Sequence, residues 1–281
     1  MQEKEKIGIF TFEQFHGKKD IGSSRIRGTN LVKYWDEAEI FKYGQKYDAI
    51  IFQKVYFDEY LELYDGIKIL DICDPDWTIS DIMETVNKVD AVTCPTNEIA
   101  NFFRNVTDKK VKVISDRHDL ELYRECKIHK GRAKEVVWHG YSHNSHVLKS
   151  AIYALERFNL NLSIISDNLV TILNKESKCN ERFTKWNLEK FGEEMIKSDI
   201  CIMPSSMRPN DRFKSDNKTT LAWSLGLPVA TNVDELSLYL NEEQRIRESV
   251  KRLDEVRKNY DVRKSVEEYK ELIEEIKKEK K

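Results

Sequence analysis

Residues 199–235 read DICIMPSSMRPNDRFKSDNKTTLAWSLGLPVATNVDE and predict a strand, a polar loop, a short helix and a second strand, in that order. The first part, residues 199–204, is a short apolar run that ends in proline, which is typical of a parallel strand buried on both faces. After the polar loop we expect a helix to begin at residues 217–218. Glycine and proline within residues 226–228 end that helix, and residues 229–233 form the next predicted strand.

The loop between the first predicted strand and the helix concentrates positive charge. It contains Arg208, Arg212 and Lys214, and Lys218 stands at the start of the predicted helix. The free backbone N–H groups and the positive dipole end of a helix attract anions. We therefore expect a phosphate or diphosphate to be held by Arg212, Lys214 and Lys218, together with the backbone N–H groups of Lys218 and Thr219.

Several segments of the chain resemble GT-B glycosyltransferases, the enzymes with two Rossmann domains that use nucleotide-sugar donors. Residues 222–231, AWSLGLPVAT, are similar to the EAMAxGxPVVAT segment of the retaining, group 1 or family 4-like members. Weaker matches follow in the family's order at residues 22–27 (GSSRIR), 113–119 (VISDRHD), 136–140 (VVWHG) and 191–199 (FGEEMIKSD). The resemblance implies a hexosyltransferase-type enzyme that moves a sugar from a UDP- or GDP-linked donor to a hydroxyl of a glycan or small molecule.

The chain departs from this family at two positions. Many retaining members have two glutamates that bracket seven residues, one near the sugar and one on the ribose. Phe213 and Leu221 stand at those positions here, and neither side chain can accept a hydrogen bond from a hydroxyl. The departure implies a donor held mainly through its phosphates. The resemblance to the retaining members favours retention at the sugar.

Strand-like and helix-like patterns alternate along the chain, which predicts parallel sheets. The predicted strands cover residues 7–12, 49–53, 67–72, 91–94, 111–114, 135–138, 162–166, 200–203 and 229–233. The predicted helices cover residues 28–37, 58–64, 79–86, 97–104, 146–158 and 188–197, one helix that begins at 217–218, and most of 242–281.

We therefore expect an α/β fold with two Rossmann-like domains whose parallel sheets face a cleft. Residues 1–130 form the acceptor-side domain and residues 131–258 the domain that binds the nucleotide sugar, with the polar, basic stretch 124–134 as the linker. The resemblance implies that the C-terminal helix, residues 259–281, packs back on the N-terminal domain.

Composition limits the functions that this chain can have. Charged residues make up 34% of the 281 residues and the formal net charge is −2, so no global field attracts nucleic acid. The five cysteines show no CxxC spacing, and Cys73, Cys94 and Cys201 lie in apolar runs, which favours buried, reduced thiols in a cytoplasmic protein. Because residues 1–6 are charged, we expect neither a signal peptide nor a membrane anchor at the N-terminus.

Loops that follow strands are the places where open parallel sheets bind ligands. After the first predicted strand, His16 is a candidate catalytic group, and Gly22, Ser23 and Arg25 are candidate donor contacts. Glycine lets a backbone approach a ligand, and arginine in this loop, including Arg27, can reach an anion. The alternative is a solvated surface loop that a serine caps.

Residues 71–77, DICDPDW, follow the third long strand of the first domain. Asp74 is the catalytic candidate there, because a carboxylate at the end of a strand can orient a sugar hydroxyl or act as a base. The alternative is an ordinary Asp-Pro turn.

The turn after residues 135–138 supplies the donor-side candidates of the second domain. We expect a diphosphate or sugar over His139, Gly140 and Ser142. Asp167 and Trp186 lie where the resembling enzymes contact the nucleotide base, although an isolated tryptophan is more often a core residue. The remaining donor-binding candidates are Asn217, Lys218, Thr219 and Thr220.

No metal site or other cofactor is expected. The three histidines within residues 139–146 could bind one metal ion together only if this segment were a helix. The segment is predicted as a loop. No Asp-x-Asp motif occurs in a suitable loop, so cationic side chains are expected to neutralise the diphosphate.

Two other functions stay open: a phage-type enzyme that glycosylates a hydroxymethylated DNA base, and a binding protein with the GT-B fold but no catalysis.

Overall fold

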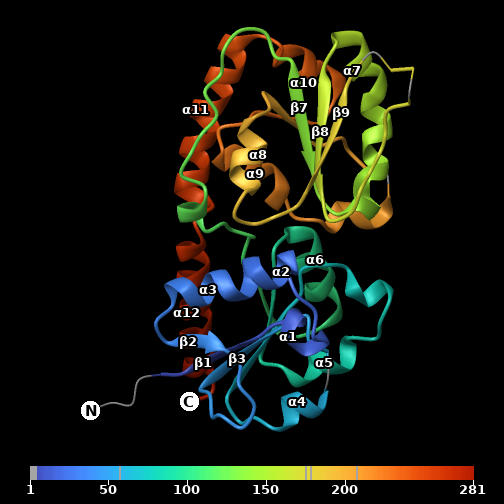
Figure 1. The fold of residues 1–281 in the computed structure, drawn as a ribbon. Helices are drawn as coiled ribbons and strands as arrows, with labels where there is room; N and C mark the ends of the chain where they lie inside the picture. Colours follow the sequence, from blue (N-terminus) through green and yellow to red (C-terminus); the bar gives the residue numbers. More distant parts are fainter. Residues whose placement is uncertain (1–4, 57, 175, 178, 207) are drawn as a thin grey trace. The chain divides into compact units, whose positions relative to one another are not determined.

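The computed structural model describes residues 5–56, 58–174, 176–177, 179–206 and 208–281. The charged N-terminal residues 1–4 and Met207 of the basic loop lie outside the described residues. The chain divides into two compact units, each described here by itself (Figure 1). Unit 1 comprises Met1–Asp119, Arg208–Ser215 and Tyr260–Lys281, and unit 2 comprises Leu120–Met207 and Asp216–Asn259.

Unit 1 contains a six-stranded parallel sheet in the order β2-β1-β3-β4-β5-β6. Its strands are β1 (Ile7–Phe10), β2 (Ala38–Ile40), β3 (Ala49–Gln53), β4 (Ile67–Asp71), β5 (Ala91–Cys94) and β6 (Lys110–Val113). The helices and helical turns are α1 (Phe12–His16), α2 (Gly22–Ser24), the π-turn η1 (Arg25–Thr29), α3 (Asn30–Tyr34), α4 (Asp58–Glu62), the 3₁₀ turn η2 (Asp76–Thr78), α5 (Met83–Lys88), α6 (Asn97–Val106), the 3₁₀ turn η5 (Pro209–Phe213) and α12 (Val262–Glu279).

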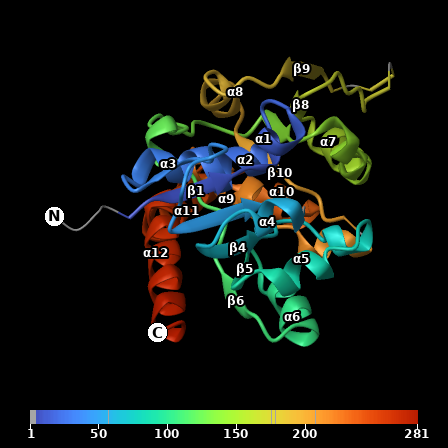
Figure 2. The ribbon, with the colours of Figure 1, turned by 90° about the horizontal axis from the view of Figure 1, so that it is seen from below.

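The inner strands of unit 1, β1, β3, β4 and β5, are buried on both faces because helices cover each side. One face packs Phe52, Val92 and Phe103 of α6, and the other packs Ile51 against Tyr269 of α12. Figure 2 shows α12 on one side of β4–β6 and α5 and α6 on the other. The predicted return of the C-terminal helix to the first domain is therefore confirmed.

Unit 2 contains a five-stranded parallel sheet in the order β11-β10-β7-β8-β9. Its strands are β7 (Glu135–His139), β8 (Asn161–Ser166), β9 (Glu181–Lys185), β10 (Ile200–Ile202) and β11 (Val229–Ala230). The helices and 3₁₀ segments are η3 (Leu120–Leu122), η4 (Ser142–Ala151), α7 (Ile152–Phe158), α8 (Phe191–Ile196), α9 (Asn217–Ser224), α10 (Val233–Leu238) and α11 (Glu242–Asn259). Residues of α7 and α10 cover one face of the sheet, and residues of α8 and α9 cover the other.

The α/β prediction with two parallel sheets is confirmed, but several element bounds were wrong. The helix predicted at residues 79–86 begins only at Met83, after an extended turn. The strand predicted at 229–233 ends at Ala230, because the side chain of Asn232 accepts a hydrogen bond from Glu235 N and caps α10. The first half of the helix predicted at 146–158 is 3₁₀ rather than α.

The basic loop also differs from its predicted place. Residues 208–215 leave β10 of unit 2 and pack into unit 1 before the chain returns to α9. Phe213 is buried with its ring centroid 5.2 Å from that of Trp77, and Thr96 Oγ1 donates to Phe213 O. Ser215 Oγ donates to Asp116 Oδ2 at 2.5 Å. The loop is therefore a strap that belongs to the core of unit 1.

Candidate active site

The sheet of unit 2 changes its strand order at β7, which pairs with β8 on one side and β10 on the other. Ligands of open parallel sheets bind at such switch points, beyond the carboxyl ends of the strands. Gly140 directly follows β7 at this point and has φ of 155°, a conformation that residues with a side chain rarely adopt. Its backbone N–H donates to Ile165 O at the end of β8, which holds the turn against the sheet.

Lys218 of α9 reaches this turn. Its Nζ lies 2.6 Å from the position that a Cβ on Gly140 would take and 5.7 Å from the ring centroid of Trp138. The missing side chain of Gly140 therefore makes room for the ammonium group. Because α9 begins at Asn217, its first free backbone N–H groups lie beside Lys218 in the chain. A fixed cation and a helix N-terminus together form an anion-binding arrangement.

His139 stabilises this arrangement, and its ring is buried instead of open to a ligand. The side chain is buried, its Nε2 donates to Lys218 O at 3.2 Å, and its ring packs edge-on against Phe191 at 5.1 Å between centroids. His139 thus holds the first turn of α9 against the end of β7.

The predicted donor contacts Ser142 and Asp167 bond to each other. Asp167 Oδ1 accepts hydrogen bonds from Ser142 N at 2.7 Å and Ser166 Oγ at 3.0 Å. Burial raises the pKa of Asp167, but these hydrogen bonds outweigh burial and hold the pKa below its ordinary value. The ionised carboxylate of Asp167 therefore holds the turn after Gly140 in place through these hydrogen bonds.

The other predicted donor contacts of unit 2 have different surroundings. Thr220 is fully buried, and its hydroxyl donates to Asp216 O and Asn217 O, so it stabilises the first turn of α9. Asn217 and Thr219 are half-buried in the same turn. Trp186 is half-buried and packs against the core that Phe191 and Ile165 share, which agrees with the core alternative.

Arg212 and Lys214 lie in the strap of unit 1, whereas Lys218 lies in unit 2. The guanidinium of Arg212 stacks on the ring of Phe213 at 4.6 Å, and Lys214 pairs with Asp211. Phe213, at the position of the first family glutamate, is a core residue of unit 1. Leu221, at the position of the second, packs partly buried against the core of unit 2.

The loop after β1 in unit 1 folds into α1, α2 and η1. Ser24, not the predicted Ser23, makes the central contacts: its Oγ accepts from Glu13 N and donates to Gln53 Oε1 at 2.9 Å. Gly22 begins α2, and the half-buried side chains of Ser23 and Arg25 lie on α2 and η1. The sequence interpretation had no signal for the role of Gln53, which also accepts from Phe12 N.

Arg27 is a structural residue and does not face a ligand. It is 3% exposed, and it donates to both carboxylate oxygens of Asp71 and to Asp116 Oδ1 at 2.8 Å. Tyr269 and Thr93 also donate to Asp71, at 2.9 and 2.7 Å. The suggestion that Arg27 binds an anion in the cleft is therefore wrong, because two buried carboxylates already neutralise its charge.

A second polar cluster lies at the carboxyl ends of β3 and β4, which are neighbouring strands of the unit 1 sheet. Lys54 follows β3 with φ of 54°, an uncommon value for a lysine. Its Nζ is 2.6 Å from Asp74 Oδ2 and 3.3 Å from Asp76 Oδ2. Tyr56 donates to the same oxygen of Asp76 at 2.5 Å. The sequence interpretation chose Asp74 from residues 71–77, which also contain Asp76, and it missed Lys54 and Tyr56.

The predicted catalytic residue His16 lies beside this cluster. Its ring is 4.1 Å from that of Phe12, and the Nζ of Lys54 lies 5.3 Å from the Phe12 ring centroid. Burial lowers the pKa of His16, and the charges of Lys18 and Lys54 lower it further. The structure thus brings two predicted residues, His16 and Asp74, around one lysine that was not predicted.

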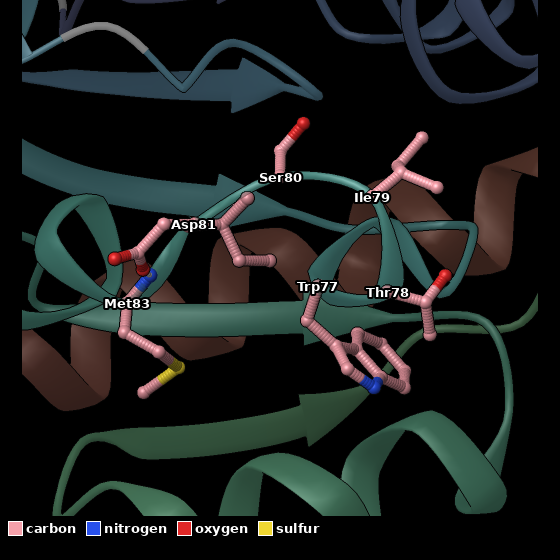
Figure 3. Close-up of a pocket in the computed structure, with 7 residues that line it drawn as sticks. Trp77, Thr78, Ile79, Ser80, Asp81 and Met83 are labelled. Carbon is pink, nitrogen blue, oxygen red and sulfur yellow. Dashed lines mark hydrogen bonds between the residues drawn. The ribbon is translucent and has the colours of Figure 1, made fainter.

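A hollow of about 380 Å³ follows this cluster along the chain. Its wall consists of consecutive residues from Trp77 to Met83, and it begins at the residue after Asp76. Figure 3 shows Ile79 and Ser80 pointing to the opposite side of the segment from the Trp77 ring. The polar groups of the wall include the hydroxyl of Thr78, which donates to Pro75 O at 2.8 Å, and the carboxylate of Asp81, whose Oδ1 accepts from Met83 N at 3.1 Å.

No group of three or more His, Cys, Asp or Glu side chains in the described part of the chain is arranged to hold a metal ion. Among the helices with described residues, none has the length and apolar character needed to cross a membrane. All five cysteines are free thiols, and Cys73, Cys94 and Cys201 are buried as predicted.

No protein-family model matches the sequence, and no curated protein matches it. Solved structures do resemble the fold. HepE of Anabaena in complex with UDP has a TM-score of 0.64 at 12% identity, over 96% of this chain and 100% of HepE. The beta-glucosyltransferase of phage T4 in complex with UDP-glucose has a TM-score of 0.58 at 12% identity, over 96% of this chain and 99% of that enzyme.

TarM has a TM-score of 0.54 at 15% identity over 80% of this chain, which spans only 54% of TarM. Identities of this size show the fold alone. Two parallel sheets, a C-terminal helix that packs on the first unit, and these structural matches lead to one conclusion: the chain has the GT-B glycosyltransferase fold.

Proposed function

We propose that the protein is a glycosyltransferase that binds a UDP-sugar in unit 2 and transfers the sugar to a hydroxyl of a glycan or small molecule. The observation that carries this proposal is the contact between Lys218 and the turn at Gly140. It places a cation, a helix N-terminus and a side-chain-free turn together at the switch point of the sheet. The UDP in the HepE structure and the UDP-glucose in the T4 enzyme structure support UDP as the first nucleotide to test.

The reaction builds up negative charge on the leaving diphosphate as the bond to the sugar breaks. Donors already aimed at that charge are the largest catalytic effect that such a site can supply. In this proposal Lys218 and the first N–H groups of α9 take that role, while His139 and Asp167 hold the turn in shape. Arg212 and Lys214 lie in the strap of unit 1, and their binding of a diphosphate stays a prediction from the sequence.

The glutamates that many retaining enzymes place on the donor are replaced here by core residues. The donor is therefore held mainly through its phosphates, which makes affinity for free UDP close to that for the UDP-sugar. The five free thiols support a reaction in the reducing cytoplasm.

The test is turnover of a panel of UDP- and GDP-sugars by the full chain, followed as released nucleoside diphosphate. We expect release from a UDP-sugar, and a loss of turnover in Lys218→Ala but not in Lys149→Ala, an exposed lysine of the same unit. Duplex DNA with hydroxymethylated bases is included as an acceptor. Sugar transfer to that DNA, with a steep loss of binding on adding salt, would show a DNA-modifying enzyme instead. A protein that binds UDP but transfers no sugar to any acceptor or to water would be a binding protein.

A further inference from the structure

The end of helix α9 is held by residues 124–134, the stretch that the sequence interpretation treated as a linker. This capping segment belongs to unit 2 and runs beside α11 (Figure 1). Three successive backbone carbonyl groups at the end of α9 accept hydrogen bonds from it. The bonds run from Cys126 Sγ to Ser224 O at 3.8 Å, from Lys127 N to Leu225 O at 2.8 Å and from His129 Nε2 to Gly226 O at 2.9 Å. The capping segment therefore fixes the end of the helix whose first turn carries Lys218.

Both ring nitrogens of the buried His129 have fixed roles. Nε2 donates to Gly226 O, and Nδ1 accepts from Arg245 Nε at 3.2 Å, so the ring is neutral. Arg245 is 0% exposed, and its guanidinium donates to three further carbonyl oxygens. These belong to Tyr239 and Leu240, at 2.9 Å each, and to Gly131, at 2.6 Å. The cation is thus held against the ring by the end of α10 and by the capping segment.

A proton cannot be added to Nδ1 of His129 without movement. It would set two N–H donors and two positive charges against each other at 3.2 Å in a buried site. Because the ring also donates to Gly226 O, its displacement withdraws the cap from the end of α9. The backbone of Gly226 has φ of 72°, and a Cβ there would lie 3.0 Å from Ser249 Oγ and 3.4 Å from Cys126 Cβ. This turn is packed tightly between α11 and the capping segment, so a shift of the ring is passed to the turn.

Other charged groups decide the pH at which the ring takes up a proton. Around the pair of His129 and Arg245 they are Lys127 of the capping segment, Asp199 before β10 and Glu242 of α11. Lys127 Nζ pairs with Asp199 Oδ1 at 3.0 Å, and Glu242 accepts from Gly131 N. Burial lowers the pKa of His129, and the bond to Gly226 raises it. The charges of Arg245 and Lys127 lower this pKa while Asp199 raises it, and the net pKa lies below the ordinary value of 6.5.

We propose that His129 positions the donor cation Lys218 through α9 and makes binding of the nucleotide sugar depend on pH. This inference rests on the proposed function, because it concerns the same donor site. With a neutral ring, His129 holds the end of α9, while His139 Nε2 donates to Lys218 O and holds its start. With a protonated ring the end of the helix is released, and the ammonium group of Lys218 loses its fixed place over the turn at Gly140. His129 is thus a positioning residue that does not touch the donor.

The experiment is titration calorimetry of UDP-glucose into the full chain between pH 5 and 8, with circular dichroism at each pH to show that the chain is folded. UDP-glucose is the probe because its two phosphates stay ionised over this range, unlike the terminal phosphate of UDP. Affinity of the wild type should be level above about pH 6.5 and fall at lower pH by up to about tenfold per pH unit, the slope of a single proton.

Three variants identify the group that titrates. His129→Gln keeps a side-chain donor and acceptor but does not titrate, so its affinity should stay level. Lys127→Met removes a charge that lowers the pKa of His129 and keeps the backbone bond to Leu225 O, so the fall should begin at higher pH. Lys127→Met also tests the proposal if His129→Gln does not fold. His143→Gln, an exposed histidine of the same unit, is the control and should follow the wild type.

The outcomes separate this inference from the proposed function. If the fall persists in His129→Gln, disappears in His143→Gln or keeps its place in Lys127→Met, another group titrates and the role given to His129 is wrong. A folded wild type that binds UDP-glucose equally well at every pH also contradicts the inference, while the donor site stands. If the wild type binds neither UDP-glucose nor UDP at any pH, the proposed function fails and the inference fails with it.

Discussion

The Nζ of Lys218 lies 2.6 Å from the point where a Cβ on Gly140 would stand. The two residues belong to different elements of unit 2, and the space for the cation exists because the turn carries no side chain. This relationship links the local backbone at the end of β7 to the charge that the proposed donor site depends on.

Replacing Gly140 by Ala should therefore damage both stability and donor binding. The backbone has φ of 155°, and the new Cβ meets both Lys218 and Trp138. We expect unit 2 to lose about 1 to 3 kcal/mol of unfolding free energy and UDP to bind more weakly. Thermal unfolding with and without UDP measures both effects. Gly192→Ala is the matched control, because its Cβ meets only ordinary contacts and alanine favours helix α8. Equal behaviour of the two variants would contradict the close approach of Lys218.

The buried ion pairs of Arg27 predict a large effect in unit 1. Arg27→Met leaves the carboxylates of Asp71 and Asp116 buried without their cation. Breaking a buried pair from one side costs about 3 to 5 kcal/mol, which urea unfolding would measure. Arg104→Ala, an exposed arginine of the same unit, should change stability by less than about 0.5 kcal/mol. A loss in Arg27→Met no larger than in this control would show that the pairs contribute little.

His129 predicts how stability depends on pH. Its Nε2 donates to Gly226 O at 2.9 Å, and its Nδ1 accepts from Arg245 Nε at 3.2 Å, so the folded protein holds the neutral ring. Burial lowers its pKa, the bond to Gly226 raises it, and the charges of Arg245 and Lys127 lower it, while Asp199 opposes them. The net pKa lies below the ordinary value of 6.5.

The unfolded chain therefore binds a proton at His129 at a pH where the folded chain does not. Stability from this group is full above about pH 6.5 and falls as the pH drops below it. His129→Gln removes the titration and should flatten the change in melting temperature between pH 7 and 5. An unchanged pH profile in this variant would rule out His129 as the source.

Much of the fold was readable from local patterns. Strands β3 and β5 have their predicted bounds, because each is a mostly apolar run that an aspartate precedes and that Lys54 or Pro95 follows. Strands β2 and β9 were missed since they are edge strands: the residues of β2 are half-buried, and the sequence of β9, ERFTK, is mostly polar. Edge positions lack the apolar pattern that identifies buried strands.

The candidate site was only partly readable, because its contacts are distant in sequence. The strap packs through Phe213, whose carbonyl bonds to a residue 117 positions earlier, and no local pattern shows such a partner. The sequence around Arg27 suggests an exposed cation, but the side chain is buried and paired with Asp71 and Asp116. No sequence pattern pointed to Lys54, since lysine has no preference for a backbone conformation with positive φ. By contrast, a turn after a strand pointed to Gly140 and a cation at a helix start pointed to Lys218, and their role in donor binding stays a prediction.

Titration calorimetry of UDP into the wild type, Lys218→Ala and Lys149→Ala tests the donor site most directly. A charge-assisted hydrogen bond to a phosphate contributes about 1.5 to 3 kcal/mol, so Lys218→Ala should weaken UDP binding by roughly tenfold to hundredfold. Lys149→Ala should bind UDP as the wild type does, and circular dichroism should show all three folded. Equal UDP affinity in the wild type and Lys218→Ala, or no binding of UDP to the wild type at millimolar concentration, would contradict the assignment of the diphosphate site to Lys218 and Gly140.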